Sequence, residues 1–413
     1  MDVSYLKEKP KNKVFEYMEK KIGIIEISEP THYSAVNGLM KPYAWDKSNT
    51  VYVFTIEKIA IALKENGLPD NARLIIYTEK DNLKEFFKKV ESYEFERFHL
   101  CTVSKYYNEF LQFTPQCKEL YFHVHNVETW FDDNLSQRFL LLRNDLRNTA
   151  SKISPLKKIG RFVKEIIFKR YRQQILKKID TYNHHFIVHS SGVKQYLAKF
   201  VPADKITVFP FAIYEHMSDN SVNNTKLRIC VPGIVSNGRR DYDSLFRVLS
   251  ANAEKLKGKL TVDLLGFIPK EELQLVDTIK TLQSNGIEIL YYLEFVFGEK
   301  YDRPLSYADI ILGNLRVEKN SAQKYGQTKE SGTVYNMVRG AKPGLLPQDY
   351  PLDEEFNASS LLFKDYDHLG EMIVQLVKDP ARIEYLKEQA KINSEQFSPA
   401  PLYQLLMGKK VNA

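Results

Sequence analysis

The sequence predicts an α/β protein with two facing Rossmann-like, doubly wound domains and a cleft between them. Short apolar segments alternate with helix-like segments along the chain, and the alternation restarts after a polar gap at residues 219–226. Short buried strands that alternate with helices are typical of a parallel sheet covered by helices on both faces. The chain has 413 residues, whereas a single core stops growing beyond about 250–300 residues. Two domains are therefore expected.

The expected elements fall into two series. In the first half, strands are expected at 22–27, 50–56, 73–77, 99–103, 120–124 and 186–189, with helices at 57–67, 83–90 and 192–200. In the second half, strands are expected at 227–231, 260–265, 287–291, 309–313, 344–347 and 360–363, with helices at 242–256, 270–284, after Gly332, at 369–378 and at 380–395. We therefore expect domains at 1–212 and 213–394, and a tail at 395–413 that packs back on the first domain.

The composition excludes several classes of protein. Hydrophobic residues make up 43% and charged residues 27% of the chain, which indicates a globular protein. The three cysteines form no CxxC pair, so neither a disulfide framework nor a zinc site is expected. The first residues lack an apolar signal region, and no run of about 18 apolar residues occurs. We expect a cytoplasmic protein with no bound metal and no cofactor.

One segment, residues 152–178, carries the excess of positive charge. It holds ten basic residues and one acidic residue, while the whole chain has a net charge of +7. Apolar residues recur within it at helical spacing, which predicts an amphipathic basic helix. Such a helix suits an anionic membrane surface, and a helix packed on its own domain with a solvated basic face is the alternative. No nucleic-acid recognition motif accompanies the charge, so nucleic acid is not an expected partner.

The segment 325–347 (YGQTKESGTVYNMVRGAKPGLLP) joins a Lys-Glu-Ser-Gly turn to the start of an expected helix. The first turn of a helix directs unpaired N–H groups toward an anion, so Ser331, Gly332 and Thr333 are candidates for binding a phosphate. Lys329 adds a cation, and the carboxylate of Glu330 suits sugar hydroxyls. An ordinary surface loop before a helix is the alternative.

A second candidate loop in the same half is 231–241 (VPGIVSNGRRD), where a glycine turn at Gly233 follows a strand. Two guanidinium groups, Arg239 and Arg240, come just before the next helix and could hold a diphosphate with charge-assisted hydrogen bonds. A solvated basic pair is the alternative. Asp241 and Asp243 resemble a metal-binding pair, but acidic residues are ordinary in the first turn of a helix.

Three loops at strand ends of the first half carry polar candidates. The loop 29–39 contains His32 and a possible tight turn at Asn37-Gly38. In 121–130 (YFHVHNVETW), His125 and Asn126 lie at the expected strand tip, where an imidazole can hydrogen-bond a sugar hydroxyl or support a developing charge. His123 is expected to be structural. The third loop, 189–192 (HSSG), suits either an anion or a plain helix cap.

These segments resemble the nucleotide-sugar glycosyltransferases of the GT-B type, especially the family 4-like bacterial enzymes of capsule and O-antigen assembly. The resemblance rests on 186–213, on 227–249 and on 330–343, which is similar to the donor-binding helix of the family. No Walker A, GxGxxG or GxSxG motif points to another class.

The resemblance implies a role for each candidate residue. Arg239 or Arg240 and Lys329 would hold the donor diphosphate. Glu330, Ser331 and Gly332 would meet the donor sugar and its phosphates, while the loop from His32 to Gly38, with His125, would face the acceptor. The catalytic candidates are then His125 and Glu330.

The activity implied is metal-independent transfer of a sugar from a nucleotide sugar to a glycan or polyprenyl-linked acceptor in cell-surface polysaccharide biosynthesis. The basic helix would hold the enzyme at the inner face of the cell membrane. Many relatives carry a second glutamate where Asn336 stands here. A non-catalytic sugar- or nucleotide-sugar-binding protein is therefore an alternative, and a nucleotide-sugar 2-epimerase is another.

Overall fold

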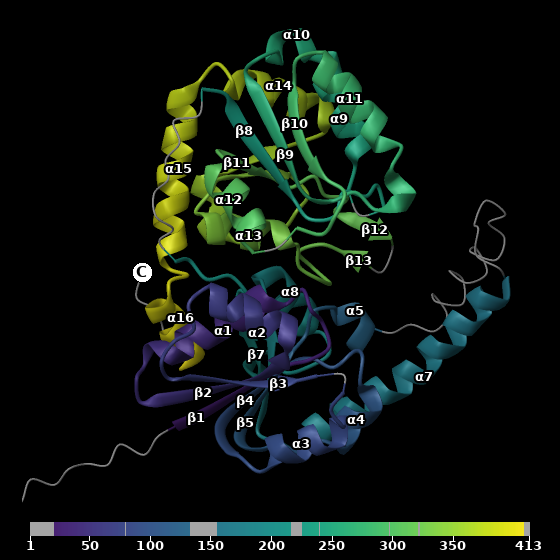
Figure 1. Ribbon diagram of the computed structural model, residues 1–413, viewed down its shortest axis with the longest axis vertical. Helices are drawn as coiled ribbons and strands as arrows, with labels where there is room; N and C mark the ends of the chain where they lie inside the picture. Colours follow the sequence, from purple (N-terminus) through teal and green to yellow (C-terminus); the bar gives the residue numbers. More distant parts are fainter. Residues whose placement is uncertain are drawn as a thin grey trace, which may run out of the picture.

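The computed structural model describes residues 20–78, 80–132, 155–215, 225–238, 240–296, 298–320 and 323–408. Within these ranges the chain forms two parallel sheets, which lie one above the other in Figure 1 with helices packed around each. The prediction of a two-domain α/β architecture is confirmed.

The first sheet contains all six strands that the sequence predicts for the first half, and a short seventh strand. Across the sheet their order is β3 (Ala72–Tyr77), β2 (Asn49–Ile56), β1 (Lys20–Glu26), β4 (Glu94–Thr102), β5 (Gln116–His123), β6 (His184–Val188) and β7 (Ile206–Val208). The order reverses between β1 and β4. In doubly wound sheets, ligands bind at the carboxyl ends of the strands beside such a reversal.

Both faces of this sheet are buried, which is why its strands are apolar runs rather than alternating ones. Ile24 of β1 packs in one core with Leu39 and Leu63, and Ile25 packs in another with Phe86 and Phe110. The helices beside the first core are α1 (Tyr33–Trp45) and α2 (Glu57–Glu65). Those beside the second are α3 (Leu83–Glu91), α4 (Tyr107–Gln112), α7 (Pro155–Ile179) and α8 (Ser191–Leu197), while α5 (Val127–Trp130) and η1 (Ala203–Lys205) are single turns.

The second sheet contains the six strands that the sequence predicts for the second half. Their order is β10 (Glu288–Tyr292), β9 (Leu260–Phe267), β8 (Leu227–Pro232), β11 (Ile310–Leu312), β14 (Gly344–Pro347) and β15 (Ser360–Phe363). This order reverses between β8 and β11, so a second binding crevice is expected there. A small antiparallel ribbon, β12 (Glu318–Asn320) with β13 (Gln323–Lys324), follows β11.

The helices of the second domain also lie on two sides of its sheet. One core includes residues of α9 (Tyr242–Ala251), α10 (Ala253–Leu256), α11 (Leu275–Ser284) and α14 (Tyr366–Leu376), while α12 (Glu299–Tyr307) and α13 (Gly332–Gly340) contribute to the core that continues into the first domain. The expected helix at 242–256 is interrupted at Asn252, and the one at 270–284 begins as a separate turn, η2 (Lys270–Glu272). The remaining turn is η3 (Glu354–Ser359).

The end of the chain returns to the first domain. Helix α15 (Pro380–Glu395) runs down the side of the second domain, and α16 (Pro399–Leu406) then packs on α1 (Figure 1). The Tyr403 hydroxyl donates to the Asp46 carboxylate, and Arg97 donates to the backbone carbonyl of Leu406. The two domains are therefore joined by both the crossing after β7 and this returning helix.

The prediction of a loop at 29–39 is wrong over most of this range, because α1 begins at Tyr33 and continues through Asn37 and Gly38. The Asn-Gly pair is a turn signal, but Val36, Leu39 and other apolar residues around it recur at helical spacing and are fully buried. Tertiary packing of this stripe overrides the local signal. Gly38 has its own packing reason, since a Cβ there would lie 3.4 Å from the backbone of Phe211.

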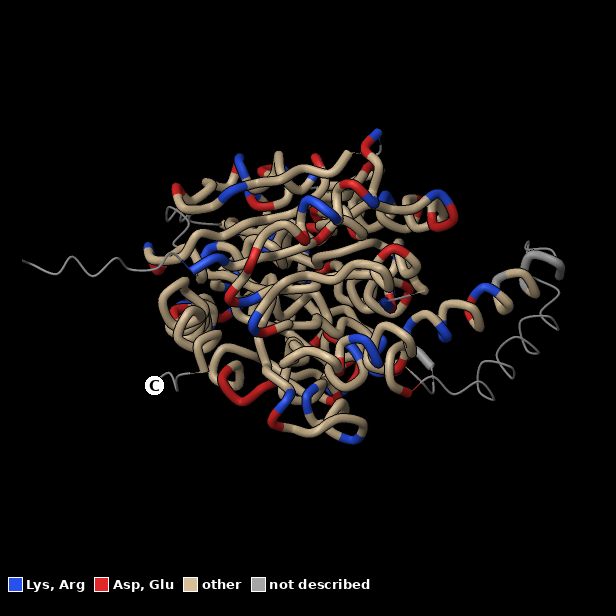
Figure 2. The backbone as a smooth tube through the Cα atoms, turned by 90° about the horizontal axis from the view of Figure 1, so that it is seen from below, with Lys and Arg blue, Asp and Glu red and all other residues tan. Residues whose placement is uncertain are grey.

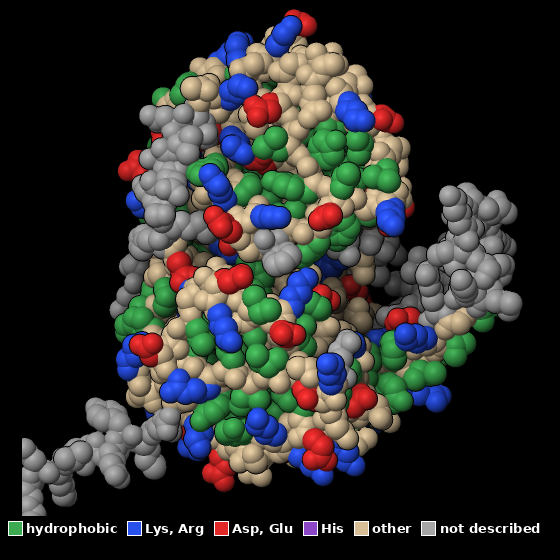
Figure 3. Space-filling view, viewed as in Figure 1, with side chains coloured by type: hydrophobic (Ala, Val, Ile, Leu, Met, Phe, Trp, Pro, Cys, Tyr) green, Lys and Arg blue, Asp and Glu red, His purple; other side chains and the backbone are tan. Residues whose placement is uncertain are grey.

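Helix α7 has one packed half and one projecting half. Ile175 and Ile179, near its end, are buried against the domain, whereas Ile159, Val163 and Ile167 are 44–48% exposed. Figure 2 shows the helix leaving the body of the molecule with basic residues along it, and Figure 3 shows apolar side chains beside them. Among the described helices, α7 included, none is both long and apolar enough to cross a membrane.

Candidate functional site between the domains

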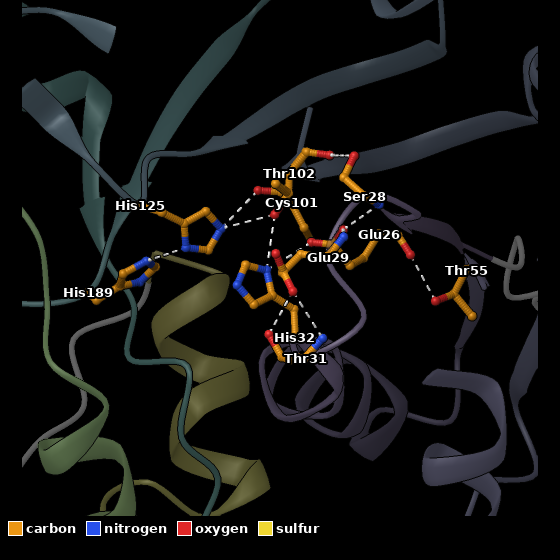
Figure 4. Close-up of polar contacts among 10 residues, drawn as sticks. All are labelled: Glu26, Ser28, Glu29, Thr31, His32, Thr55, Cys101, Thr102, His125 and His189. Carbon is orange, nitrogen blue, oxygen red and sulfur yellow. Dashed lines mark hydrogen bonds and ion pairs between the residues drawn. The ribbon is translucent and has the colours of Figure 1, made fainter. Parts of the chain in front are cut away.

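A cluster of polar side chains lies at the reversal point of the first sheet, where β1, β4, β5 and β6 end. His32 Nδ1 lies 3.1 Å from Glu26 Oε2 and 3.1 Å from Thr102 Oγ1. His125 Nε2 donates to the backbone carbonyl of Cys101 over 3.0 Å, and His189 Nε2 lies 3.4 Å from His125 Nδ1 (Figure 4). The order of the strands therefore brings together candidate residues that are far apart in the sequence; His32 and His189 are separated by 157 positions.

Glu26 anchors this cluster, although the sequence did not single it out. Its carboxylate is fully buried, and its Oε1 accepts hydrogen bonds from the backbone N–H groups of Ser28 and Glu29. Its Oε2 faces His32, which directly precedes α1. A buried carboxylate must be hydrogen-bonded, so Glu26 fixes the His32 ring. The only available signal was its position at the end of an apolar strand.

The histidines deeper in the cluster are neutral. Burial lowers the pKa of His125 well below its usual range, with the neighbouring His32 and His189 adding to the effect. Burial also lowers the pKa of His189 to about 3. A neutral imidazole can both donate and accept a hydrogen bond. His125 and His189 can thus bind sugar hydroxyls as donors and acceptors, and they contribute no positive charge at neutral pH.

His123 lies behind the cluster, as expected of a structural residue. Its Nε2 is 3.0 Å from His99 Nδ1, and His99 Nε2 is 2.8 Å from the Tyr43 hydroxyl. Burial lowers the pKa of His123 well below its usual range and that of His99 to about 3. These rings hold β4, β5 and α1 together within the core.

The loop at 189–192 combines a helix cap with an interdomain contact. Ser190 caps α8, because its hydroxyl accepts from the backbone N–H of Val193. The backbone N–H of Ser191 donates to both carboxylate oxygens of Asp353 in the other domain, over 3.1 and 3.2 Å. A Cβ at Gly192 would overlap the carbonyl oxygen of Gly326, so the two backbones can meet here because Gly192 has no side chain.

The segment 329–333 lies across from these residues on the second domain. The hydroxyl of Ser331 caps α13 by accepting from the backbone N–H of Thr333. Glu330 Oε1 accepts from the backbone N–H of Ser331 and from the Tyr350 hydroxyl. Burial raises the pKa of the Glu330 carboxyl. Gly332 begins the helix with open space around its α-carbon.

Asn126 and Lys329 meet directly across the domain boundary. Their backbones form an isolated β-bridge, and the backbone N–H of Val127 donates to the Thr328 carbonyl over 2.8 Å. The Lys329 ammonium lies 4.6 Å from the centre of the Tyr325 ring. Two segments that the sequence marked independently are thus adjacent in space.

Arg240 lies where the strand order of the second sheet reverses, and its guanidinium group lies against Gly233. Its Nη2 donates to the Pro232 carbonyl, while Nε and Nη1 are buried without a hydrogen-bond partner. The residue is 9% exposed. A Cβ at Gly233 would collide with the guanidinium group, and this glycine has a φ of 100°. Arg239, the other predicted diphosphate ligand, lies outside the described residues.

A cavity of about 210 Å³ opens between the domains on one side of α13; we call it the basic cavity. Lys58 and Arg339 line it, and none of its described lining residues is Asp or Glu. Asn37 also faces it, so this residue lies at the interdomain surface although the turn predicted for it is absent. The full lining is Pro30, Thr31, Tyr33, Ser34, Asn37, Lys58, Ala62, Phe211, Ala212, Ile213, Phe295, Val296, Tyr301, Gly332, Tyr335, Asn336 and Arg339.

The basic cavity contains Asn336, which the sequence singled out, and Tyr301 and Arg339, which it did not. Asn336 donates to the Gly332 carbonyl over 2.6 Å and accepts from the Tyr301 hydroxyl over 3.0 Å. Arg339 pairs with Asp302 over 2.6 Å. Nothing local in the sequence distinguishes Tyr301 or Arg339 from ordinary helix residues, because their position depends on how α12 and α13 pack.

A second cavity, of about 250 Å³, lies on the other side of α13; we call it the acidic cavity. Its described lining includes Glu330, Asp353 and Glu355 but no Lys or Arg. The remaining lining residues are His189, Ser190, Val208, Pro210, Val334, Tyr335, Val338, Tyr350, Pro351, Leu352, Phe356, Gln396, Phe397, Pro401, Leu402 and Leu405. Tyr335 lines both cavities.

Comparison with known proteins identifies the architecture. No protein-family model and no curated protein sequence matches the chain. Among solved structures, Anabaena HepE in complex with UDP superposes with a TM-score of 0.59 at 11% identity, covering 94% of this chain and 98% of that one. A glycosyltransferase from Rickettsia africae gives 0.57 at 12% identity, covering 94% and 97%.

The chain has the GT-B fold. Sucrose-phosphate synthase from Thermosynechococcus elongatus, with a TM-score of 0.52 at 14% identity and coverage of 94% and 97%, has the same arrangement of two facing sheets. At such low identity the likeness describes the fold. What this GT-B protein does must be argued from its own cavities. Among the described residues, no group of three or more His, Cys, Asp or Glu could hold a metal ion.

Proposed function

We propose that this protein is a glycosyltransferase that uses a nucleoside diphosphate sugar as donor. The observation that carries the proposal is the start of α13 at Gly332, which opens into the basic cavity beside Lys58 and Arg339. The first N–H groups of a helix and its positive dipole end bind phosphate groups. The solved HepE structures contain UDP and UDP-glucose, which makes UDP sugars the first donors to test.

The chemistry follows from the position of the charges. In the transfer, the bond between the sugar C1 and the phosphate oxygen breaks, and a bond from C1 to an acceptor hydroxyl oxygen forms. The leaving diphosphate gains negative charge, which the N–H groups of α13 and nearby cations such as Arg240 and Lys329 would stabilise in place of a metal ion. We assign no cofactor.

The acceptor hydroxyl loses its proton in this step, so a nearby base is needed. His125 is our candidate because the Cys101 carbonyl accepts its Nε2–H, which leaves the other ring nitrogen as a proton acceptor. The free electron pair is then on Nδ1, facing His189. Glu330, His32 and Asn126 would position donor and acceptor hydroxyls around it.

We further propose that the acceptor is a glycan or polyprenyl-linked glycan at a membrane surface, as in surface polysaccharide biosynthesis. The support is α7, whose exposed Ile159, Val163 and Ile167 lie beside the basic residues Lys164 and Arg170. An apolar stripe flanked by cations binds the boundary of an anionic bilayer. The protein would then work at the inner face of the cell membrane.

A second candidate function is suggested by Asn336. An amide at this position, held by Gly332 and Tyr301, lacks the charge of the glutamate that similar glycosyltransferases place here. A protein that binds the nucleotide sugar without transferring the sugar would tolerate this difference.

A donor screen with product detection tests both functions. The protein is mixed with UDP-, GDP- and CMP-sugars and with the free nucleotides, and its melting temperature is measured. A ligand at about 100 times its dissociation constant stabilises a protein by about 2.7 kcal/mol. Release of nucleoside diphosphate that depends on a glycan acceptor supports the transferase. Stabilisation without release favours the binding protein, and no stabilisation by any nucleotide contradicts both.

A further inference from the structure

The acidic cavity is not explained by donor binding. It lies between the domains, with His189 and Ser190 on one side and the loop 350–356 on the other, and α13 separates it from the basic cavity. A nucleoside diphosphate carries negative charge, and a cavity lined by Glu330, Asp353 and Glu355 repels such a ligand. These carboxyl groups, whose pKa values burial raises, favour a neutral or positively charged occupant.

The wall of this cavity contains buried polar atoms that lack partners. Glu330 Oε2 and the Tyr335 hydroxyl are both buried without a hydrogen bond. The Tyr335 hydroxyl lies near the carboxylates of Glu330 and Asp353, which together with burial raise its pKa. A buried polar group without a partner costs about 1–3 kcal/mol. A ligand that supplies hydroxyl groups would satisfy both atoms.

The rest of the lining is apolar and partly aromatic. Phe356 and Phe397 are stacked with their ring centres 5.6 Å apart, and Leu402 and Leu405 of α16 close one side. Carboxylate acceptors beside apolar walls suit a sugar ring, which has hydroxyls at its edge and C–H groups on its faces. The volume of about 250 Å³ is below the usual range of about 300–1,000 Å³ for drug-sized ligands, so a single ring fits best.

We propose that the acidic cavity binds one neutral monosaccharide unit, held by Tyr335, Glu330 and Glu355. The biological role of this sugar site rests on the proposed function, which it deepens. In that role, the bound unit belongs to the acceptor glycan. His189, which lines the cavity, also contacts His125, so the acceptor would enter from the side of α13 opposite to the nucleotide.

The binding itself is tested with methyl glycosides of glucose, galactose, mannose and N-acetylglucosamine, followed by saturation-transfer NMR and calorimetry on the full chain. Methyl glucuronide, which has the same ring and a negative charge, is the matched ligand control. We expect at least one neutral glycoside to bind and the glucuronide to bind at least tenfold more weakly. Binding of the glucuronide with equal affinity would overturn the proposal, as would the absence of binding by every neutral glycoside.

Two variants locate the site. Glu355→Gln removes a charge at the mouth without changing the shape, and Leu405→Trp fills part of the cavity from a half-buried position. Each should weaken glycoside binding at least tenfold, while Glu354→Gln, at a neighbouring residue that is not part of the cavity lining, should leave it unchanged. Wild-type affinity in both Glu355→Gln and Leu405→Trp would place the glycoside elsewhere and overturn the proposal.

The same samples are titrated with UDP, so that the two proposals fail separately. UDP binding without glycoside binding leaves the donor site intact and removes only this inference. Glycoside binding without binding of any nucleotide keeps the sugar site and contradicts the proposed transferase.

Discussion

The basic and acidic cavities lie on opposite sides of one short helix, α13, and differ in charge more than in size. Their volumes are about 210 and 250 Å³. The described lining of the first contains Lys58 and Arg339 and no carboxylate, and that of the second contains three carboxylates and no cation. Helical geometry explains how one element serves both, since residues three or four apart share a face.

The comparison teaches how the fold separates two kinds of ligand. Gly332, Asn336 and Arg339 follow one another along one face of α13 toward the basic cavity, while Val334 and Val338 face the acidic cavity. The charged donor is attracted to one side and repelled from the other. Tyr335 lines both cavities and is therefore the point at which donor and acceptor would approach each other.

The largest expected effect concerns three buried neutral histidines, of which His189 lines the acidic cavity and His99 and His123 lie in the core behind it. His99, His123 and His189 are at most 7% exposed, and their pKa values are lowered by burial. The unfolded chain therefore binds more protons below a pH of about 6.5. Each histidine should lower the free energy of unfolding by about 1.4 kcal/mol per pH unit below that value, or about 4 kcal/mol in total at pH 5.5.

Chemical denaturation at pH 7.5, 6.5 and 5.5 measures this loss. Glu330 and Asp353, whose pKa values are raised by burial, act in the opposite direction, so the His99→Gln variant is needed to isolate one histidine. Its pH dependence should be shallower than that of the wild type. Equal slopes in the two proteins would show that His99 is protonated in the folded state.

The second largest expected effect is the loss of UDP affinity when a negative charge is placed in the basic cavity. Gly332→Asp places a carboxylate at the start of α13, where a Cβ meets no atom within 4 Å. Because this carboxylate occupies and repels the phosphate position, we expect UDP affinity measured by calorimetry to fall at least 100-fold. Gly332→Asn, which has the same shape without the charge, is the control and should lose much less. Glycoside binding in the acidic cavity should persist in both variants.

A smaller effect is expected at α7. Lys164→Glu with Arg170→Glu reverses two exposed charges on the projecting helix. Since each cation near an anionic membrane contributes about 1 kcal/mol, binding to vesicles that contain phosphatidylglycerol should weaken by more than tenfold. Lys378→Glu with Lys391→Glu, on the second domain, is the matched control. Unchanged flotation of the α7 variant would contradict a membrane role, and neither change should alter UDP affinity.

The smallest expected effect concerns the contribution of Lys58 to UDP binding in the basic cavity. Lys58 is exposed and lies 4.8 Å from the centre of the Phe295 ring. An exposed charge contributes about 0–1 kcal/mol, so Lys58→Gln should weaken UDP binding by about three- to fivefold and reduce its dependence on salt. Identical salt dependence in the variant and the wild type would exclude Lys58 from the donor site.

The sequence predicted the two series of strands because fully buried parallel strands are short apolar runs, as in β1 and β8. It missed α1, where the turn signal Asn37-Gly38 is overruled by packing of the apolar stripe. It also missed α16, although Pro399 stands at the first helical position, where proline is favourable. Candidates at strand ends, such as His32 and His125, could be named from their positions. Their contact could not be predicted, because it depends on the order of β1, β4 and β5 in the sheet.

The two cavities could not be predicted from the sequence, because they too depend on how distant elements pack together. Asp353 and Glu355 carry no local motif. They become part of a site only because the segment around η3 meets α16 and the residues after β6, which lie on the first domain. Arg240 was predicted as a diphosphate ligand, with a solvated basic pair as the alternative. Its burial against Gly233 depends on a backbone turn that a single sequence does not specify.

The most direct test of the account is a crystal structure of the protein with UDP bound. The account predicts the diphosphate at the start of α13 beside Gly332, within the basic cavity, and no nucleotide in the acidic cavity. A diphosphate found beside Asp353 and Glu355, or away from α13, would contradict the separation of donor and acceptor by this helix.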